Sequence, residues 1–155
     1  MKRILITISF LTVVYSAYAK PLNVGGYFTL DVPAEFKPRI PKPGTNIIYF
    51  ASVLGYGGGA IKILAITSPN PDYHLSESQL LRNIIPDDEL VVMGLKKVKL
   101  NGIPAVVTTS QWLPKSVLHE IDLWFAGKKF TVQLAHADGD VPPWVDFIIE
   151  SITPL

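Results

Sequence analysis

A β-hairpin in the middle of the chain constrains the fold more than any other feature of the sequence. The segment Lys96–Leu100 alternates in the way typical of a half-buried strand. The dipeptide Asn101-Gly102 is a strong tight-turn signal, and the run Ile103–Trp112 follows it as the partner strand. Because tight turns join antiparallel neighbours, this segment predicts an antiparallel sheet.

A second hairpin is predicted over Val117–Phe125 and Lys129–Ala137, and it carries two histidines on one face. With a two-residue type II′ turn at Gly127-Lys128, His119 lies directly opposite His136. Stable zinc sites almost always need three or four protein ligands, so a neutral, hydrogen-bonded pair at the core margin is expected in place of a metal site. If both rings are partly buried, desolvation and mutual repulsion lower their pKa.

The first half of the mature chain predicts three more strands, over Tyr27–Val32, Asn46–Val53 and Ala60–Thr67. The proline-rich stretch 33–44 between the first two is expected to be an extended loop. The glycine-rich segment 54–59 partly matches the dinucleotide fingerprint G-x-G-x-x-A. That fingerprint needs a helix to follow, and a β-branched run follows here, so the segment is interpreted as a hairpin tip.

Two helices are predicted. The first covers Leu75–Ile85, where Ser76 and Gln79 form a capping box and an apolar stripe follows that should pack on a sheet. The second opens at Pro142-Pro143 and places Trp144 and further apolar residues on one stripe. Strands that alternate and helices with one apolar stripe together predict an α+β fold, with an antiparallel β-sheet packed against two or more α-helices.

The N-terminus has the pattern of a secretory signal peptide. Lys2 and Arg3 form a positive region, an apolar run of about 11 residues follows, and Ala17-Tyr18-Ala19 is a cleavage site of the A-x-A type. The run is shorter than the roughly 20 residues that a membrane-spanning helix needs. We therefore predict residues 1–19 to be a cleaved signal peptide and residues 20–155 to be a single exported globular domain, periplasmic or secreted. No cysteine follows the site, so no lipid anchor is expected.

Composition excludes several classes of function. Lys and Arg number 14 against 13 Asp and Glu, which leaves no basic excess for nucleic-acid binding, and the chain has no cysteine. The sequence contains neither a G-x-S-x-G elbow nor a P-loop. Glu120 and Asp122 share one face of a strand and are interpreted as a polar face, with an acid/base pair as the alternative. We therefore predict no catalytic residue, no metal and no cofactor.

Three aromatic residues have no obvious core role: Tyr56 at the glycine-rich tip, Trp112 near a strand end and Trp124 on a polar strand face. Aromatic residues are enriched among the anchors of protein interfaces. These three are the candidate binding residues, with burial inside the fold as the alternative, and the expected partner is another protein.

Four segments carry a resemblance to a known family: Tyr27–Pro33 (YFTLDVP) with Phe36 after it, Lys99–Ala105 (KLNGIPA), Phe125–Val132 (FAGKKFTV) and Phe147–Ile152 (FIIESI). In their order along the chain they resemble the PsbP-like superfamily, which includes photosystem extrinsic proteins and DcrB-like proteins. The resemblance implies an α/β/α sandwich and a binding or scaffolding role without catalysis. It implies no site residues, and Phe36 stands where the family usually has Trp.

Three functions remain open on the sequence alone. The first is a non-catalytic exported module that binds or scaffolds another protein. The second is a specialised form of it, a periplasmic immunity protein or inhibitor of a toxic hydrolase. The third is a carrier of a small apolar ligand, or an enzyme, with its site in a pocket between helix and sheet.

Overall fold

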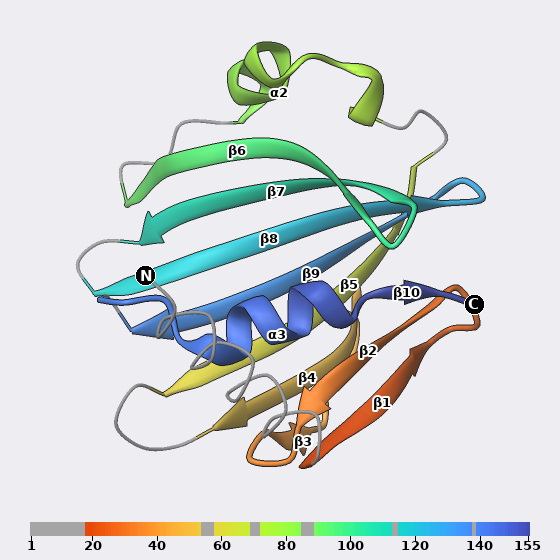
Figure 1. The fold of residues 1–155 in the computed structure, drawn as a ribbon, viewed down its shortest axis with the longest axis vertical. Helices are drawn as coiled ribbons and strands as arrows, with labels where there is room; N and C mark the ends of the chain where they lie inside the picture. The colour runs from red at the N-terminus through yellow and green to blue at the C-terminus, as the bar shows by residue number, and fades with distance from the viewer. Residues whose placement is uncertain (1–17, 54–57, 69–71, 85–88, 113–114, 138) are drawn as a thin grey trace, which may run out of the picture.

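The protein is built on a seven-stranded antiparallel sheet (Figure 1). The computed structural model describes residues 18–53, 58–68, 72–84, 89–112, 115–137 and 139–155. The strands follow one another across the sheet in the order β3 (Lys37–Arg39), β4 (Ile47–Val53), β5 (Gly59–Thr67), β9 (Lys128–Ala137), β8 (Ser116–Phe125), β7 (Ile103–Trp112) and β6 (Leu90–Leu100). The strands β3 and β6 are therefore its two edges.

A second layer covers one face of this sheet. It consists of helix α3 (Pro143–Ser151) and a small antiparallel sheet, in which β2 (Phe28–Pro33) pairs with β1 (Ala19–Val24) on one side and with β10 (Thr153–Pro154) on the other (Figure 1). Helix α2 (Glu77–Asn83) lies next to β6, and the 3₁₀ turn η1 (Asp72–His74) before it contacts β7. The predicted α+β class, antiparallel strands packed with helices, is confirmed.

The core lies between the two layers. Alternate residues of each strand of the large sheet point toward α3 and β2, as the period of two requires. Residues from both layers are completely buried, at 0% exposure: Phe28, Leu30, Ile61, Ile63, Ile121, Leu123, Val132, Leu134, Ile148 and Ile152. The alternation that predicted the strands is therefore also the pattern that builds the core.

The turn between β8 and β9 differs from the prediction. It consists of Ala126-Gly127, both with positive φ (43° and 78°), which is typical of a type I′ turn and not of the expected type II′ turn at Gly127-Lys128. His119 consequently pairs with Leu134, while His136 pairs with Val117, so the histidines are not direct partners. A shift of two residues keeps every side chain on its face, so the apolar pattern alone could not have revealed it.

Helix α2 also differs from the prediction, because none of its residues is buried and Leu81 is 42% exposed. The capping box at Ser76 is confirmed. The helix is held at the edge of the sheet by polar contacts: the backbone N–H of Lys97 donates to Glu77 Oε1 (2.8 Å), and Lys97 Nζ donates to the carbonyl of Leu75 (3.0 Å). Helix α2 thus covers a backbone N–H group at the edge of β6. The apolar stripe of the helix had predicted packing on the sheet instead.

Two strands occur where none was predicted. The strand β1 precedes the first predicted strand, and β3 lies inside the stretch expected to be a loop. Pro38 is tolerated in β3 because an edge strand pairs on one side only. In addition, β6 begins at Leu90, six residues before the predicted start.

Helix α3 packs closely on β5. Trp144 is 6% exposed, and a Cβ atom added at Gly59 would lie 2.6 Å from Cζ2 of its ring. Glycine at this position therefore allows the helix to approach the sheet. Among the described residues, no helix has the length and apolar character needed to cross a membrane.

Replacing Gly59 by alanine should lower the free energy of unfolding by about 1–3 kcal/mol, the usual cost of overpacking. The added methyl group would collide with Trp144 and would lie 3.2 Å from the carbonyl oxygen of Ala135. Urea unfolding followed by circular dichroism measures the change. Gly94→Ala is the matched control, since a Cβ there meets nothing within 4 Å. Equal stability of the two variants would contradict the close packing of α3 on β5.

Candidate functional site

The structure describes two of the three aromatic candidates, and it does not bring them together. Trp112 ends β7 and pairs with Ser116 at the start of β8. Trp124 lies eight residues further along β8 than Ser116. Trp112 is 46% exposed, and its Nε1 donates to Glu89 Oε2 at 3.4 Å. Tyr56 lies outside the described residues.

Trp124 is partly buried under the η1 turn. Its ring lies 5.6 Å from that of Tyr73, centroid to centroid, and its Nε1 is buried with no hydrogen-bond partner in the described part of the chain. Tyr73 therefore covers part of this indole. Trp112 is thus the more accessible of the two indoles.

The structure adds exposed apolar residues that the sequence analysis missed. Val91 is 49% exposed and Met93 62% exposed, and both lie near the start of edge strand β6, where Leu90 pairs with Trp112. A register shift between Val92 and Gly94 leaves Met93 outside the regular pairing. We call Val91, Met93 and Trp112 the β6 apolar edge. In the sequence, the signal for these exposed residues was the run Leu90–Met93, which is apolar throughout and does not alternate.

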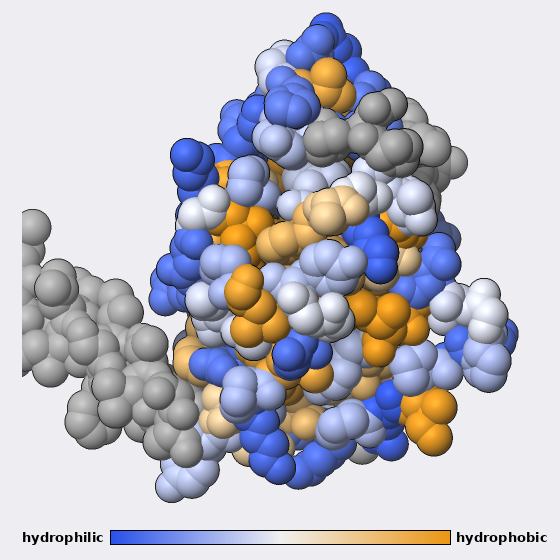
Figure 2. Space-filling model, turned by 90° about the vertical axis from the view of Figure 1, so that its right-hand side faces the viewer, coloured by the Kyte–Doolittle hydropathy of each residue, from blue (hydrophilic) through white to orange (hydrophobic). Residues whose placement is uncertain are grey.

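The opposite end of the molecule has a different surface. Figure 2 views the end that carries the β6–β7 and β8–β9 turns and the C-terminus, and apolar residues there form separate patches between hydrophilic ones. Single exposed apolar side chains are normal on protein surfaces, whereas grouped ones indicate a binding surface. The β6 apolar edge brings three such side chains to one end of the β6–β7 pair. Trp112 pairs with Leu90, so the side chains of Trp112 and of Val91, the residue after Leu90, point to opposite faces of the sheet.

His119 and His136 do meet, as diagonal neighbours on the inner face. His136 Nδ1 lies 2.6 Å from the carbonyl oxygen of Ala137 and so donates its proton to it. In the neutral ring the other nitrogen, Nε2, then accepts from His119 Nε2 at 3.1 Å. Thr109 Oγ1 completes the chain by donating to His119 Nδ1, also at 3.1 Å. Every member is satisfied when both rings are neutral.

The electrostatic surroundings of His119 favour its neutral form. Burial lowers the pKa of His119, and repulsion from His136 lowers it further, while the carboxylate of Asp146 on α3 opposes both and has the smallest effect. Both rings are nearly inaccessible, at 6% and 3% exposure. Within the described residues, no group of three or more possible metal ligands is present. The geometry is that of a structural hydrogen-bonded pair.

Glu120 and Asp122 each have a cross-strand partner on the outer face. Gln133 Nε2 donates to Glu120 at 2.8 Å, and Asp122 accepts from both Thr131 and Lys129. These bonds join residues that the β8–β9 register places directly or diagonally opposite each other. The two carboxylates belong to a polar ladder, which supports their interpretation as a solvated face.

No known family profile and no curated protein sequence matches this chain. Among solved structures, it is similar to the cyanobacterial PsbP of Synechocystis sp. PCC 6803, with a TM-score of 0.71 and 10% identity over 90% of this chain and 94% of that one. It is also similar to PA94 of Pseudomonas aeruginosa, a protein of unknown function, with a TM-score of 0.56 and 15% identity over 89% of this chain and 98% of that one. The chain has a PsbP-like fold.

The resemblance inferred from the sequence is thereby confirmed for the fold. The PsbP-like fold is retained here at 10–15% identity, so the layers and their order are shared while most residues are not. Fold alone does not specify a function, which depends on the residues of a site. The likeness of fold therefore assigns no function to the surfaces described above.

Acidification should destabilise the protein through the histidine pair. Since the pKa of His119 is lower in the folded than in the unfolded chain, the unfolded chain binds more protons once the pH falls through about 6.5. The free energy of unfolding should then decrease by at most about 1.4 kcal/mol per pH unit for one such proton. Urea unfolding between pH 8 and pH 5 measures this slope, which His119→Gln should reduce.

The matched control is His74→Gln, which makes the same change at an exposed position on η1. Its slope should equal that of the wild type. If His119→Gln keeps the full wild-type slope as well, the pair is not linked to stability in this way.

Proposed function

We propose that the protein is an exported, non-catalytic module that binds another protein through the β6 apolar edge. The observation that carries this proposal is the exposure of Val91 and Met93 near the start of edge strand β6 and of Trp112 at the adjoining end of β7. Methionine and tryptophan are enriched in protein interfaces, where burial of their apolar surface supplies much of the affinity.

The way β6 is covered also supports a side-chain interface. Near Lys97 the edge is covered by the carboxylate of Glu77, and near Met93 the register shift interrupts regular pairing. Both features oppose the addition of a partner strand along β6. The partner would instead contact the protruding side chains, in particular Met93 and Trp112.

The state of the titratable groups supports a role without catalysis. The two inner histidines use their ring nitrogens in one internal chain of hydrogen bonds, and the two outer carboxylates are engaged by cross-strand neighbours. A general acid or base must have its proton-transfer atom free to reach a substrate. These four groups are occupied in holding the sheet together.

Export is proposed from the N-terminal pattern. Cleavage after Ala19 would remove one residue from β1 and would leave the pairing from Lys20 to Val24 in place. The second layer of the fold would therefore persist in the mature protein.

N-terminal sequencing of the protein from the secreted or periplasmic fraction should begin at Lys20. A variant with Ala19→Leu, which alters the small residue at the cleavage site, should accumulate with residue 1 or 2 as its first residue. Wild-type protein that starts at Met1 in the membrane fraction would contradict the cleavage.

Binding through the β6 apolar edge can be tested by photo-crosslinking. A photoreactive phenylalanine analogue at position 93 should give a crosslinked protein in cells of the source organism, and Trp112→Ala should weaken that crosslink severalfold. The same analogue at Leu155 is the matched control, because this side chain is 67% exposed but lies at the opposite end of the molecule (Figure 1). Equal crosslinking from positions 93 and 155 would refute the proposed interface.

Mass spectrometry of the crosslinked band then identifies the partner. A toxic hydrolase, inhibited by the wild type and less so by Trp112→Ala, would make the protein an immunity protein or inhibitor. A partner whose activity does not change on binding would make it a scaffold.

A further inference from the structure

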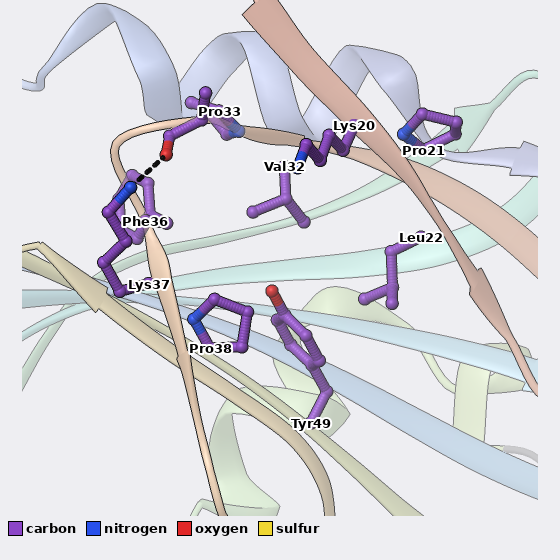
Figure 3. A pocket seen from close by; sticks show the side chains of 10 residues that line it. Lys20, Pro21, Leu22, Val32, Pro33, Phe36, Lys37, Pro38 and Tyr49 are labelled. Carbon is purple, nitrogen blue, oxygen red and sulfur yellow. Dashed lines mark hydrogen bonds between the residues drawn. The ribbon is translucent and has the colours of Figure 1, made fainter.

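A pocket opens between the two layers, on the side away from β6. It has a volume of about 390 Å³ and lies between β1, the edge of the small sheet, and β3 with β4 at the edge of the large sheet (Figure 3). Because both layers end here, the core is accessible from this side.

The floor and walls of the pocket are apolar. Val32 and Phe36 are core residues with 5% and 3% exposure, and both line it. Three prolines also line it: Pro21, Pro33 and Pro38. Proline has no backbone N–H, so these walls offer few donors to water. A space of this kind is better filled by an apolar group, since ordered water needs two to four polar partners.

One polar group points into this apolar space. The hydroxyl of Tyr49 is directed into the pocket between Pro38 and Leu22, and none of the other lining residues hydrogen-bonds it (Figure 3). Burial raises the pKa of Tyr49, which keeps its proton on the oxygen at neutral pH. The hydroxyl is thus a donor in an apolar site, where a charged acceptor gives the stronger hydrogen bond.

The charge of the pocket is positive. Lys20 and Lys37 line it, and none of its lining residues is acidic. Lys37 Nζ donates one hydrogen bond to the carbonyl of Ala34 (3.3 Å) and keeps two further N–H groups for a ligand. Two ammonium groups and a neutral phenol thus line the same pocket, and this charge favours an anion over a cation.

We propose that this pocket binds a carboxylate that carries an apolar group. The apolar group enters between the two sheets against Val32 and Phe36, and the carboxylate is held by Lys20, Lys37 and the hydroxyl of Tyr49. Such a ligand occurs as a free aliphatic acid or as the C-terminal residue of a polypeptide. The site is independent of the β6 apolar edge, because β3 and β6 are opposite edges of the large sheet.

Calorimetric titration of the purified protein with sodium octanoate tests this assignment. Octanoate should bind saturably with one site. Octanol, which has the tail without the charge, should bind at least about tenfold more weakly, since charge-assisted hydrogen bonds contribute about 1.5–3 kcal/mol. Acetate, which has the charge without the tail, should show no saturation. Equal affinity for octanoate and octanol, or no saturable binding of octanoate, would refute the proposal.

Variants locate the site. Tyr49→Phe keeps the ring and removes the hydroxyl, and Lys37→Gln removes one charge, so each should weaken octanoate binding severalfold. Lys99→Gln, which removes an exposed charge on β6 outside the pocket, is the matched control and should bind as the wild type does. Because these changes are at partly buried or exposed positions, thermal unfolding should confirm that all three proteins are folded. Unchanged affinity in Tyr49→Phe and Lys37→Gln would place binding elsewhere and refute the assignment.

A parallel titration with a peptide distinguishes the two sources of the ligand. Acetyl-Ala-Ala-Phe as a free acid and as its amide are titrated in parallel with octanoate. Tighter binding of the peptide acid than of octanoate, lost in the amide, assigns the pocket to a polypeptide C-terminus. Tighter binding of octanoate assigns it to a free aliphatic acid.

Discussion

The structure depends on covering one apolar face of the seven-stranded sheet. Residues such as Ile61, Ile121 and Leu134 are completely buried on that face, and without a second layer they would be exposed to water. Two hydrogen bonds tie the covering elements to one another: Ser151 Oγ accepts from Asp31 N (2.9 Å) and Tyr27 O from Leu155 N (3.2 Å). A third, from Asn101 Nδ2 to Ile152 O (2.7 Å), ties them to the β6–β7 turn of the large sheet. These hydrogen bonds are polar, but the layer that they hold in place covers an apolar core.

The two layers do not end together, and this mismatch creates the surfaces of interest. At β3 the sheets separate and leave the pocket around Tyr49, while at β6 the large sheet extends beyond α3 and exposes Met93. The centre of the outer face is a polar ladder around Glu120 and Gln133, with its hydrogen bonds already made. Recognition of other molecules is thus left to the two edges.

Local features of the sequence predicted the fold well, and relations between distant segments were the limit. The capping box at Ser76 and the alternating strands needed only neighbouring residues. The register of β8 and β9 depended on a turn type that the apolar pattern does not distinguish, and the exposure of α2 depended on Lys97, 20 residues beyond Glu77. The pocket around Tyr49 joins β1, β3 and β4. The strand β3 has only three residues with a proline at its centre, and β1 lacks the apolar alternation that identified β2.

The covering layer is assembled from both ends of the chain, with β1 and β2 from the beginning and α3 and β10 from the end. During synthesis, the large sheet therefore lacks its full cover until α3 and β10 have left the ribosome. Sheets with such long-range closure fold slowly, because distant segments must meet before the core is protected. For a chain that is exported as we propose, slow closure of the core would favour the unfolded state that threading through a translocation channel requires.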